Sequence, residues 1–488
     1  MMTNPTIQVP ADKYHHAEVD LNRLQYKGLP LGICSSYYLD RTYIGDFDHR
    51  LLVQIWQLVR YLIKHIRKRR YLKNYHVSLI YFKTGRDRHY CAMEKAIRKG
   101  CTEPNKVLII GPQGETDLST GRVLYHVGLK ESVEITYFLY RHRMAIRTIL
   151  QSLQLSASQQ RAYWWFLIRQ LAKGLSLRWL LTQQEGLRLV GADYDRGNDS
   201  CTLFAAARSL QKPSFTLQHG VINPPVGFAP INADEIWVWG DMARLQLIAS
   251  GVPDSCIHLT GTPIVETLTL TQEERFRIKQ QLQLKSGKTI VLALSRPDKA
   301  DDLKLVKLFH AIRQQYGKDE DNFVVKVHPT YPDTDYSWIT NEFGLAVLPI
   351  RIPYPDFMNI VDVLLAHNSG IATEVLYYHK QVGILDVLDQ SLGNGMELHK
   401  YLNVPLLKTA DDFQQLVDAE MNRLPVETTQ PHCSNASFIN THYIENQMNH
   451  SFSPFYLTGQ ASIDYIAQLL KHRLAGNGFN ANGSRPLE

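Results

Sequence analysis

The stretch from Val361 to Val387, VDVLLAHNSGIATEVLYYHKQVGILDV, decides the fold. Residues 361–368 form an apolar, β-branched run that predicts a buried strand. Residues 370–380 carry apolar side chains at helical spacing, and residues 381–387 again predict a strand. Two strands joined by a helix form a βαβ unit, in which the strands run parallel. We therefore expect a parallel sheet in this part of the chain.

The same alternation of short apolar runs and helical patterns continues along most of the chain. In the second half it predicts strands at 289–295, 322–328 and 345–350, and helices at 301–317, 335–344, 354–360, 411–424 and 461–474. In the first half the strand candidates are 29–38, 76–82, 106–111, 187–193, 214–220 and 235–240. Two helical stretches, 133–153 and 159–181, separate the third and fourth of these candidates. The pattern is that of an α/β protein.

We predict two doubly wound, Rossmann-like domains that face each other across a cleft. The N-terminal domain spans residues 1–265 and carries a helical insertion at about 133–182. The C-terminal domain spans residues 266–475 and includes the terminal helix, and residues 476–488 are expected to be a disordered tail.

Composition and charge exclude several classes of protein. The chain has 488 residues, 44% of them hydrophobic and 20% charged, which is typical of a globular protein with more than one domain. Six cysteines without any CxxC pair indicate neither a disulfide framework nor a structural zinc site, and favour a reducing compartment. The net charge of +6 is spread over both halves, which argues against a nucleic-acid binder. Without a signal peptide or an apolar span, we expect a soluble, cytoplasmic protein.

One basic segment, residues 49–73, stands out from this even distribution of charge. Its apolar residues recur at helical spacing, and it ends in the cluster formed by Lys64 and residues 67–70. One interpretation is an ordinary amphipathic helix with a solvated basic end. The other is a peripheral contact with an anionic membrane or acceptor.

Polar residues follow three predicted strands of the C-terminal domain. In open α/β sheets ligands bind at the carboxyl ends of the strands, near helix N-termini that attract phosphate. We therefore expect a nucleotide or phosphate site formed by Ser295, Arg296, Lys326, His328, Asn368, Ser369, Gly370 and Glu374.

The HNSG sequence at 367–370 is the strongest local signal in this set. It offers a hydroxyl, a glycine and free backbone N–H groups to a phosphate, and Glu374, one turn later, could accept hydrogen bonds from ribose hydroxyls. In the alternative interpretation Asn368 and Ser369 cap the helix and Glu374 complements its dipole. The chain has no GxGxxG after a strand and no GxxxxGK[ST], so dinucleotide oxidoreductases and P-loop NTPases lose their main sequence support.

Two strand ends of the N-terminal domain carry candidate catalytic residues. Asp193, Asp195 and Arg196 follow one strand, and the sequence Gln218-His219-Gly220 follows the next. A carboxylate and a histidine brought together there would supply a general base and a partner for phosphate or an oxyanion. The Asp-Tyr-Asp sequence also permits a divalent metal site, but an Asp-rich turn that caps the next helix is the preferred interpretation, and we expect no metal.

The order of these motifs resembles that of GT-B glycosyltransferases. The residues that carry the resemblance are QHG at 218–220, residues 233–252, IHLTGTP at 257–263, KVHP at 326–329 and HNSG at 367–370 with a glutamate five residues after the serine. The chain is most similar to bacterial surface and capsule polysaccharide transferases that use CMP-activated Kdo or sialic acid. The resemblance covers roughly residues 186–390.

The resemblance implies roles for individual residues. His328 and Ser369 would contact the nucleotide phosphate, with Asn368 in the place of the first serine of a Ser-Ser or Ser-Thr pair. Family members carry a D/E-D/E-G triplet with the catalytic acid, which this chain lacks, and residues 193–198 are the nearest substitute. Asp193 or Asp195 would then deprotonate the acceptor, with His219 as the alternative base.

Further roles follow from the same resemblance. Gln218, Gly220 and Arg196 would contact donor or acceptor, and His328, Arg296 and the HNSG amides would stabilise the departing phosphate. The partners would be a nucleotide-sugar and a glycan or glycolipid acceptor at the inner face of the cell membrane, with no cofactor.

Three other functions fit the same motifs. A CDP-glycerol-dependent glycerophosphotransferase and a sugar-nucleotide 2-epimerase are alternatives with the same fold. A non-catalytic nucleotide- or polysaccharide-binding protein would keep the phosphate loop without a base. The presence of both the Asp193 and Asp195 carboxylates and His219 weighs against that last alternative.

Overall fold

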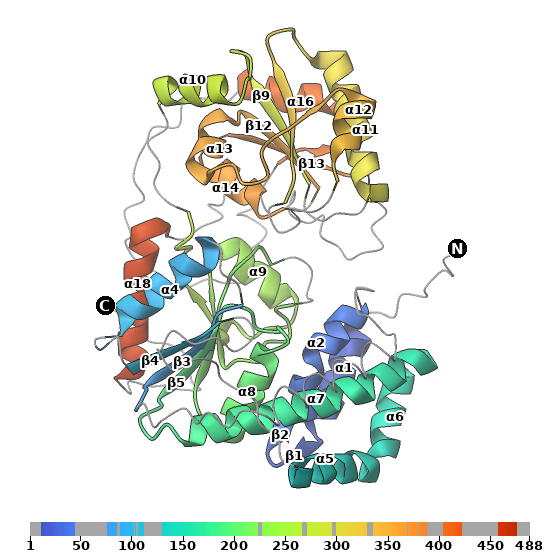
Figure 1. Ribbon diagram of the computed structural model, residues 1–488, viewed down its shortest axis with the longest axis vertical. Coiled ribbons are helices and arrows are strands. Elements are labelled where there is room, and N and C mark those ends of the chain that lie inside the picture. Colours follow the sequence, from blue (N-terminus) through green and yellow to red (C-terminus); the bar gives the residue numbers. More distant parts are fainter. Residues whose placement is uncertain are drawn as a thin grey trace, which may run out of the picture. The chain divides into compact units, whose positions relative to one another are not determined.

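The computed structural model divides the chain into two units, which are treated one at a time here (Figure 1). Unit 1 contains the described residues between 11 and 265 together with 457–475, and unit 2 contains those between 271 and 421. The structure describes residues 11–43, 76–84, 88–101, 103, 106–111, 129–222, 227–265, 271–294, 299–328, 335–367, 369–378, 380–387, 404–421 and 457–475. The predicted basic helix at 49–73 and the predicted tail at 476–488 lie outside the described residues.

Unit 1 is built on a six-stranded parallel sheet in the order β4-β3-β5-β6-β7-β8. Its strands are β3 (Leu79–Phe82), β4 (Val107–Ile110), β5 (Leu189–Ala192), β6 (Ser214–Leu217), β7 (Glu235–Val238) and β8 (Ile257–Leu259). After β4 the chain crosses back over β3 to add β5 on its other side. The switch point of this sheet, where a doubly wound domain binds its ligand, therefore lies between β3 and β5.

Helices cover both faces of the unit 1 sheet, as side-chain alternation along the strands requires. Leu79 and Tyr81 of β3 pack with α4 (Arg88–Gly100) and α18 (Gly459–Leu474). Ile80 and Phe82 point to the other face, into the core that contains α8 (Ser200–Ser209) and α7 (Ala157–Thr182). Helix α9 (Asp241–Ala249) connects β7 to β8.

The C-terminal helix α18 belongs to unit 1, so its assignment to the C-terminal domain was wrong. Figure 1 shows α18 beside α4, although about 360 residues of sequence separate them. A Cβ atom on Gly100 would lie 2.7 Å from Leu470, and Arg473 forms a 2.8 Å ion pair with Glu235. The apolar face of α18 is buried on the first sheet, and position along the sequence gave no sign of this.

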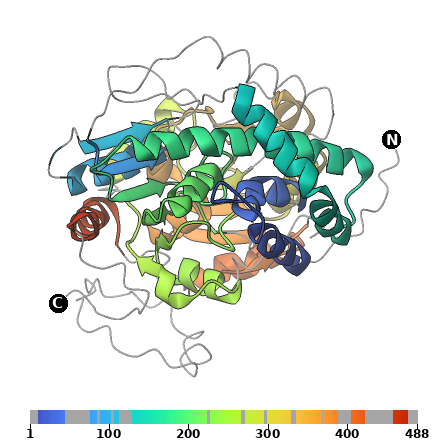
Figure 2. The same cartoon turned by 90° about the horizontal axis from the view of Figure 1, so that it is seen from below.

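A helical layer made of α1 (Ala11–Asn22), α2 (Leu31–Tyr43), α5 (Leu129–Arg141), α6 (Arg143–Ser152) and α7 lies on one side of unit 1 (Figure 2). The predicted strand at 29–38 was wrong, because only β2 (Leu29–Pro30) is extended there and pairs with β1 (Gln25–Tyr26). Helix α2 is buried on most sides, and its nearly continuous apolar run mimics a buried strand.

Unit 2 is a second six-stranded parallel sheet, in the order β11-β10-β9-β12-β13-β14. Its strands are β9 (Thr289–Ala293), β10 (Asn322–Lys326), β11 (Ala346–Val347), β12 (Val363–Ala366), β13 (Gln381–Leu385) and β14 (Leu406–Leu407). Its helices are α10 (Gln272–Gln281), α11 (Lys299–Tyr316), α12 (Ser337–Phe343), α13 (Tyr354–Ile360), α14 (Ile371–Tyr377) and α16 (Asp412–Met421). Read in chain order, this is the 3-2-1-4-5-6 arrangement of a Rossmann domain, with its switch point between β9 and β12.

The predicted fold class is confirmed by these two strand orders. The βαβ unit expected at 361–387 is present as β12, α14 and β13, with Val363 opposite Gln381 in parallel register. Within the described part of the chain, no helix combines the length and the apolar character needed to cross a bilayer.

Candidate functional site

The switch point of unit 2 lies between the ends of β9 and β12, where the sequence predicted a phosphate site. Three of the predicted residues, Ser295, Arg296 and Asn368, fall outside the described residues and stay predictions. Ser369 and Gly370 are half-buried at the start of α14. Gly370 is the N-cap residue of this seven-residue helix, so the interpretation in which Asn368 or Ser369 takes that position is not supported.

A charged pair stands beside this switch point. Lys326 is the last residue of β10, and Glu374 is buried in the middle of α14. Burial lowers the pKa of Lys326, and the negative charge of Glu374 partly offsets that effect. The Lys326 ammonium group also lies 5.5 Å from the ring centroid of Phe357 on α13. A half-buried cation therefore lies at the edge of the sheet where ligands bind.

Glu374 also acts on a tyrosine of α13. Burial raises the pKa of Tyr354, and the neighbouring Glu374 and Tyr378 raise it further. The Glu374 carboxylate thus lies close to Lys326 and Tyr354 inside unit 2. Its predicted contact with ribose hydroxyls stays a prediction.

Two histidines follow the strands β10 and β12. His328 is half-buried and comes two residues after the end of β10. His367 follows β12, and its Nδ1 lies 2.9 Å from the carbonyl oxygen of Leu385 on β13. His367 is thereby fixed to the neighbouring strand, whereas His328 is placed close to the carboxyl ends that bind ligands.

In unit 1, Asp193 bridges the two strands of the switch point. The backbone N–H of Thr84, after β3, donates to both carboxylate oxygens at 2.9 and 3.1 Å, and the Thr84 hydroxyl donates to Oδ1 at 2.8 Å. Nearby, Lys83 forms a 2.6 Å ion pair with Glu94 on α4. The contacts of Asp193 tie the end of β3 to the end of β5 and occupy the carboxylate.

Asp195 is also fully buried and fixes the segment that enters β7. Its Oδ1 accepts hydrogen bonds from the Thr216 hydroxyl at 2.8 Å and the Ala233 N–H at 3.1 Å, and its Oδ2 accepts one from the Asn232 N–H at 2.6 Å. A carboxylate with three protein donors and no exposure is poorly placed to take a proton from an acceptor sugar. These contacts favour a structural role over the predicted role as catalytic base.

Arg196 is part of a buried ion cluster, so its predicted contact with donor or acceptor was wrong. Its side chain is 1% exposed and makes paired hydrogen bonds to Asp40 of α2 and Glu18 of α1, at 2.6 to 3.2 Å. It also donates to the carbonyl oxygen of Pro230 at 2.8 Å. All the donor groups of its guanidinium face protein, and the cluster joins the loop after β5 to the first two helices.

Gln218 shapes the QHG loop from inside the protein. Its side-chain Nε2 donates to the carbonyl oxygen of Gly220 at 2.8 Å, and its Oε1 accepts from the backbone N–H of Trp239 at 2.8 Å. The indole N–H of Trp239 donates to the Gln218 carbonyl oxygen at 2.9 Å. Gln218 is fully buried, so it positions the loop, and Gly220 is the more accessible of the two predicted contact residues.

His219 is half-buried in a cage of aromatic rings. Its ring centroid lies 4.8 Å from that of Tyr194, 5.7 Å from that of Phe228 and 6.0 Å from that of Tyr90. Tyr194 follows β5, Tyr90 belongs to α4, and His219 follows β6, so the cage is built at the carboxyl end of the sheet. Of the three predicted candidates for the base, His219 is the one that is not fully buried.

Some residues of this site were missed by the sequence analysis. Lys83 and Thr84 directly follow a predicted strand, so the rule that selected Asp193 would also have selected them. The aromatic cage around His219 could not be predicted by that rule, because Tyr90 and Phe228 belong to segments far apart in sequence. Among the residues that the structure describes, no group of three His, Cys, Asp or Glu side chains is arranged to hold a metal ion.

The buried carboxylates predict a pH dependence of stability. Burial raises the pKa of Asp193 to about 7 and that of Asp195 to about 6, above the value of about 3.9 for an unfolded chain. The folded state therefore binds more protons than the unfolded state between these values. The protonated Asp193 and Asp195 carboxyl groups stabilise the folded state fully below about pH 4, and this stabilisation is lost as the pH rises through 6 to 7. Over that rise each titrating group lowers the free energy of unfolding by on the order of 1.4 kcal/mol per pH unit.

Urea denaturation at a series of pH values between 5 and 7.5 checks this expectation. The free energy of unfolding should fall with pH, and the Asp193→Asn variant should show a shallower slope because it lacks one of the buried carboxyl groups that titrate in this range. Asp319→Asn, at an exposed position of unit 2, is the matched control and should keep the wild-type slope. An unchanged slope in Asp193→Asn would contradict the assignment.

Comparisons with known proteins found likenesses of structure only. No family model matches the chain. No curated protein matches it in sequence either. Among solved structures, UDP-N-acetylglucosamine 2-epimerase from Rickettsia bellii is 14% identical, with a TM-score of 0.47 over 82% of this chain and 97% of that one. The wall teichoic acid polymerase TagF is 11% identical, with a TM-score of 0.44 over 88% and 99%.

A third likeness is to Anabaena HepE in complex with UDP and glucose. It is 12% identical, with a TM-score of 0.42 over 82% of this chain and 95% of that one. All three TM-scores lie below 0.5, so the fold assignment rests on the strand orders of the two sheets.

Proposed function

We propose that the protein is a GT-B glycosyltransferase that moves a sugar from a nucleotide-activated donor to a glycan or glycolipid acceptor. The observation that supports this most directly is the half-buried cation Lys326, at the end of β10 beside the switch point of a sheet with Rossmann strand order. A nucleotide-sugar brings two negatively charged phosphates or, in a CMP-sugar, one. A cation that is partly shielded from water interacts strongly with such a charge. The donor is therefore assigned to unit 2.

In this proposal Lys326 and His328 stabilise the negative charge that develops on the departing phosphate. Both come at the end of β10, and the half-buried Ser369 and Gly370 offer hydrogen-bond donors from the end of β12. The arrangement needs no cofactor. The specific donor we propose to test first is a CMP-sugar such as CMP-Kdo or CMP-sialic acid, on the strength of the motif resemblance.

The acceptor is assigned to unit 1, with His219 as the base that takes the proton from the acceptor hydroxyl. Asp193 and Asp195 are fully buried and engaged by Thr84 and Thr216, whereas His219 is half-buried. Aromatic faces such as those of Tyr194 and Tyr90 are also well suited to pack against a sugar ring. The attacking oxygen would form a bond to the anomeric carbon while the bond to the phosphate oxygen breaks.

Nucleotide binding by the full chain is the first test of this proposal. Melting temperatures would be measured with CMP, CDP, UDP and GDP, since a ligand that binds only the folded state stabilises it by RT ln(1 + [L]/Kd), about 2.7 kcal/mol at 100 times the Kd. For a domain of this size that is a rise on the order of 5–10 °C. The Lys326→Met variant should lose most of the rise. Lys307→Met, at an exposed position of α11, should keep it.

The four nucleotides separate the outcomes. A rise with CMP alone supports a CMP-sugar donor, and a rise with CDP, UDP or GDP redirects the donor while keeping the site. The absence of any response, or an equal response in wild type and Lys326→Met, would contradict the assignment of the donor to unit 2.

A further inference from the structure

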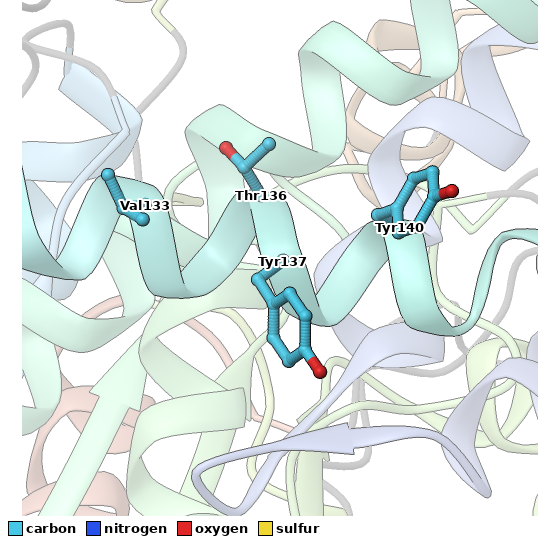
Figure 3. Close-up of a pocket in the computed structure, with 4 residues that line it drawn as sticks. All are labelled: Val133, Thr136, Tyr137 and Tyr140. Atoms are coloured by element: carbon cyan, nitrogen blue, oxygen red, sulfur yellow. The ribbon is translucent and has the colours of Figure 1, made fainter.

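Helices α5 and α6 expose large apolar side chains along one side. Val133, Tyr137, Tyr140 and Met144 are 60%, 66%, 60% and 63% exposed. Val133, Tyr137 and Tyr140 are four and three residues apart, which places them on one side of α5, and Met144 lies at the start of α6. Figure 3 shows the three that belong to α5, which line a shallow hollow of about 450 Å³ together with Thr136. We call this set of four residues the aromatic stripe.

The aromatic stripe is not the side by which these helices join the core. Ile135 and Leu139 of α5, and Ile146 and Leu150 of α6, are buried in the main hydrophobic cluster of unit 1. Helix α5 is therefore apolar on two sides, one packed and one exposed, and α6 adds the exposed Met144. Contiguous exposed apolar surface of this kind marks an interaction site in a soluble protein.

The charges beyond the first turns of α5, which carry Glu131 and Glu134, are all positive. Residues 135–184 contain no Asp or Glu, and their basic residues are Arg141, Arg143, Arg147, Arg161, Arg169, Lys173 and Arg178. The first three are exposed beside the stripe. The Arg143 guanidinium lies 4.0 Å from the ring centroid of Tyr140. It also donates a 2.8 Å hydrogen bond to the backbone carbonyl oxygen of Tyr140. The nearest described carboxylate on α5, Glu134, is paired with Lys27 at 2.6 Å.

We propose that the aromatic stripe and Arg141, Arg143 and Arg147 form a docking surface for an anionic phospholipid membrane. Tyrosine rings are suited to the boundary between lipid and water, and valine and methionine side chains can enter the acyl region. Arginines flanking such a stripe pair with lipid phosphates. A nucleic acid would bind the arginines but would not contact the exposed apolar side chains of Val133 and Met144. The combination of arginines with exposed apolar side chains therefore favours a lipid membrane.

None of the residues of this surface belongs to either switch point, and the inference does not depend on the proposed transferase activity. It also differs from the basic segment 49–73 singled out in the sequence. A surface of this kind would bring the protein to the two-dimensional layer in which a lipid-linked molecule is presented.

Vesicle co-sedimentation of the full chain tests the docking surface. Wild type should bind phosphatidylcholine vesicles that contain 40% phosphatidylglycerol, and binding should weaken as NaCl is raised from 50 to 500 mM. Changing Arg141, Arg143 and Arg147 to Gln should weaken partitioning about 100-fold, at about fivefold for each charge. The variant Tyr137→Ser/Tyr140→Ser/Met144→Ser should lose at least about tenfold.

Matched controls keep the test specific. Phe276 is 58% exposed and Lys307 is exposed, both on unit 2, so the double variant Phe276→Ser/Lys307→Gln changes similar chemistry elsewhere and should bind as wild type does. A variant with neutral residues at 67–70 measures how much the basic segment 49–73 contributes to vesicle binding, separately from the aromatic stripe. Thermal unfolding of every variant shows that the fold is intact.

Four outcomes would overturn the inference. The first is the absence of vesicle binding by wild type, and the second is unchanged binding by both stripe variants. The third is a loss confined to the variant at residues 67–70. The fourth is evidence for a partner of another kind. That partner would be RNA if the stripe variants abolish RNA binding, or a second copy of the chain if they abolish a concentration-dependent dimer in sedimentation, in either case with vesicle binding unaffected.

Discussion

Replacing Arg196 with methionine is expected to lower the free energy of unfolding by about 3–5 kcal/mol at pH 8. The reason is that Glu18 and Asp40 are both buried against its guanidinium. Methionine has similar length but no charge, so the two carboxylates would be left in the interior without a partner. Asp40 would still accept a hydrogen bond from the Gly227 N–H at 2.9 Å, which is too little to compensate a charge.

The size of this loss should depend on pH in a defined direction. Burial raises the pKa of Glu18 to about 7, although Arg196 opposes the rise. Removing Arg196 would raise that pKa further, so at pH 5.5 Glu18 would be protonated and would no longer be a buried charge without a partner. The loss measured by urea denaturation should therefore be smaller at pH 5.5 than at pH 8.

Two further variants separate the ion cluster from the packing of the side chain. The triple variant Glu18→Gln/Asp40→Asn/Arg196→Met removes all three charges and should regain much of the lost stability. Arg161→Met, at an exposed position of α7, should change stability by less than about 0.5 kcal/mol. A triple variant no more stable than Arg196→Met alone would show that charge burial is not the cause.

Replacing His219 with alanine is expected to reduce kcat/KM about 100- to 10,000-fold, the range measured when a general base is removed. The rate would be followed as release of free nucleotide from the donor identified by thermal shift, in the presence of an acceptor glycan. The donor-induced rise in melting temperature should persist, because His219 belongs to unit 1 and the donor is assigned to unit 2.

A structural role for His219 would give a different result from a catalytic one. His219→Phe keeps an aromatic ring among Tyr90, Tyr194 and Phe228 but has no nitrogen to take a proton. It should lose as much activity as His219→Ala, and added imidazole should restore part of the activity of the alanine variant only. His310→Ala, on α11, is the matched control and should stay within a few fold of wild type. Near-normal turnover by His219→Phe would rule out the base.

The sheets of both units could be predicted well from sequence because their strands are buried on both faces. The runs around Leu79, Val107 and Val363 are nearly all apolar, and each corresponds to a strand of the structure. The same criterion failed at residues 29–38, where a buried helix produces an equally apolar run. Strands β8 and β14 were missed because only three and two residues are extended there.

The candidate site was predictable in its location but not in the roles of its residues. The carboxyl ends of parallel strands lie at one edge of the sheet, and the rule that polar residues follow strands correctly placed Asp193, His219 and Lys326 at such ends. Whether such a side chain faces a ligand or the interior depends on contacts from distant segments. For Arg196 the deciding contacts come from α1 and α2, and for Asp195 they come from Asn232 and Ala233.

The position of α18 has a consequence for how the protein is made. Because this helix completes one face of the first sheet, unit 2 is an insertion within the chain of unit 1, and unit 1 is discontinuous. The N-terminal part of unit 1 leaves the ribosome long before residues 459–474 do. While unit 2 is synthesised, Met93, Ile97 and Trp237 therefore lack the apolar side chains of α18 that complete their core. Premature termination near residue 456 would therefore damage the N-terminal fold, and leave the more recently synthesised unit 2 with all of its described elements.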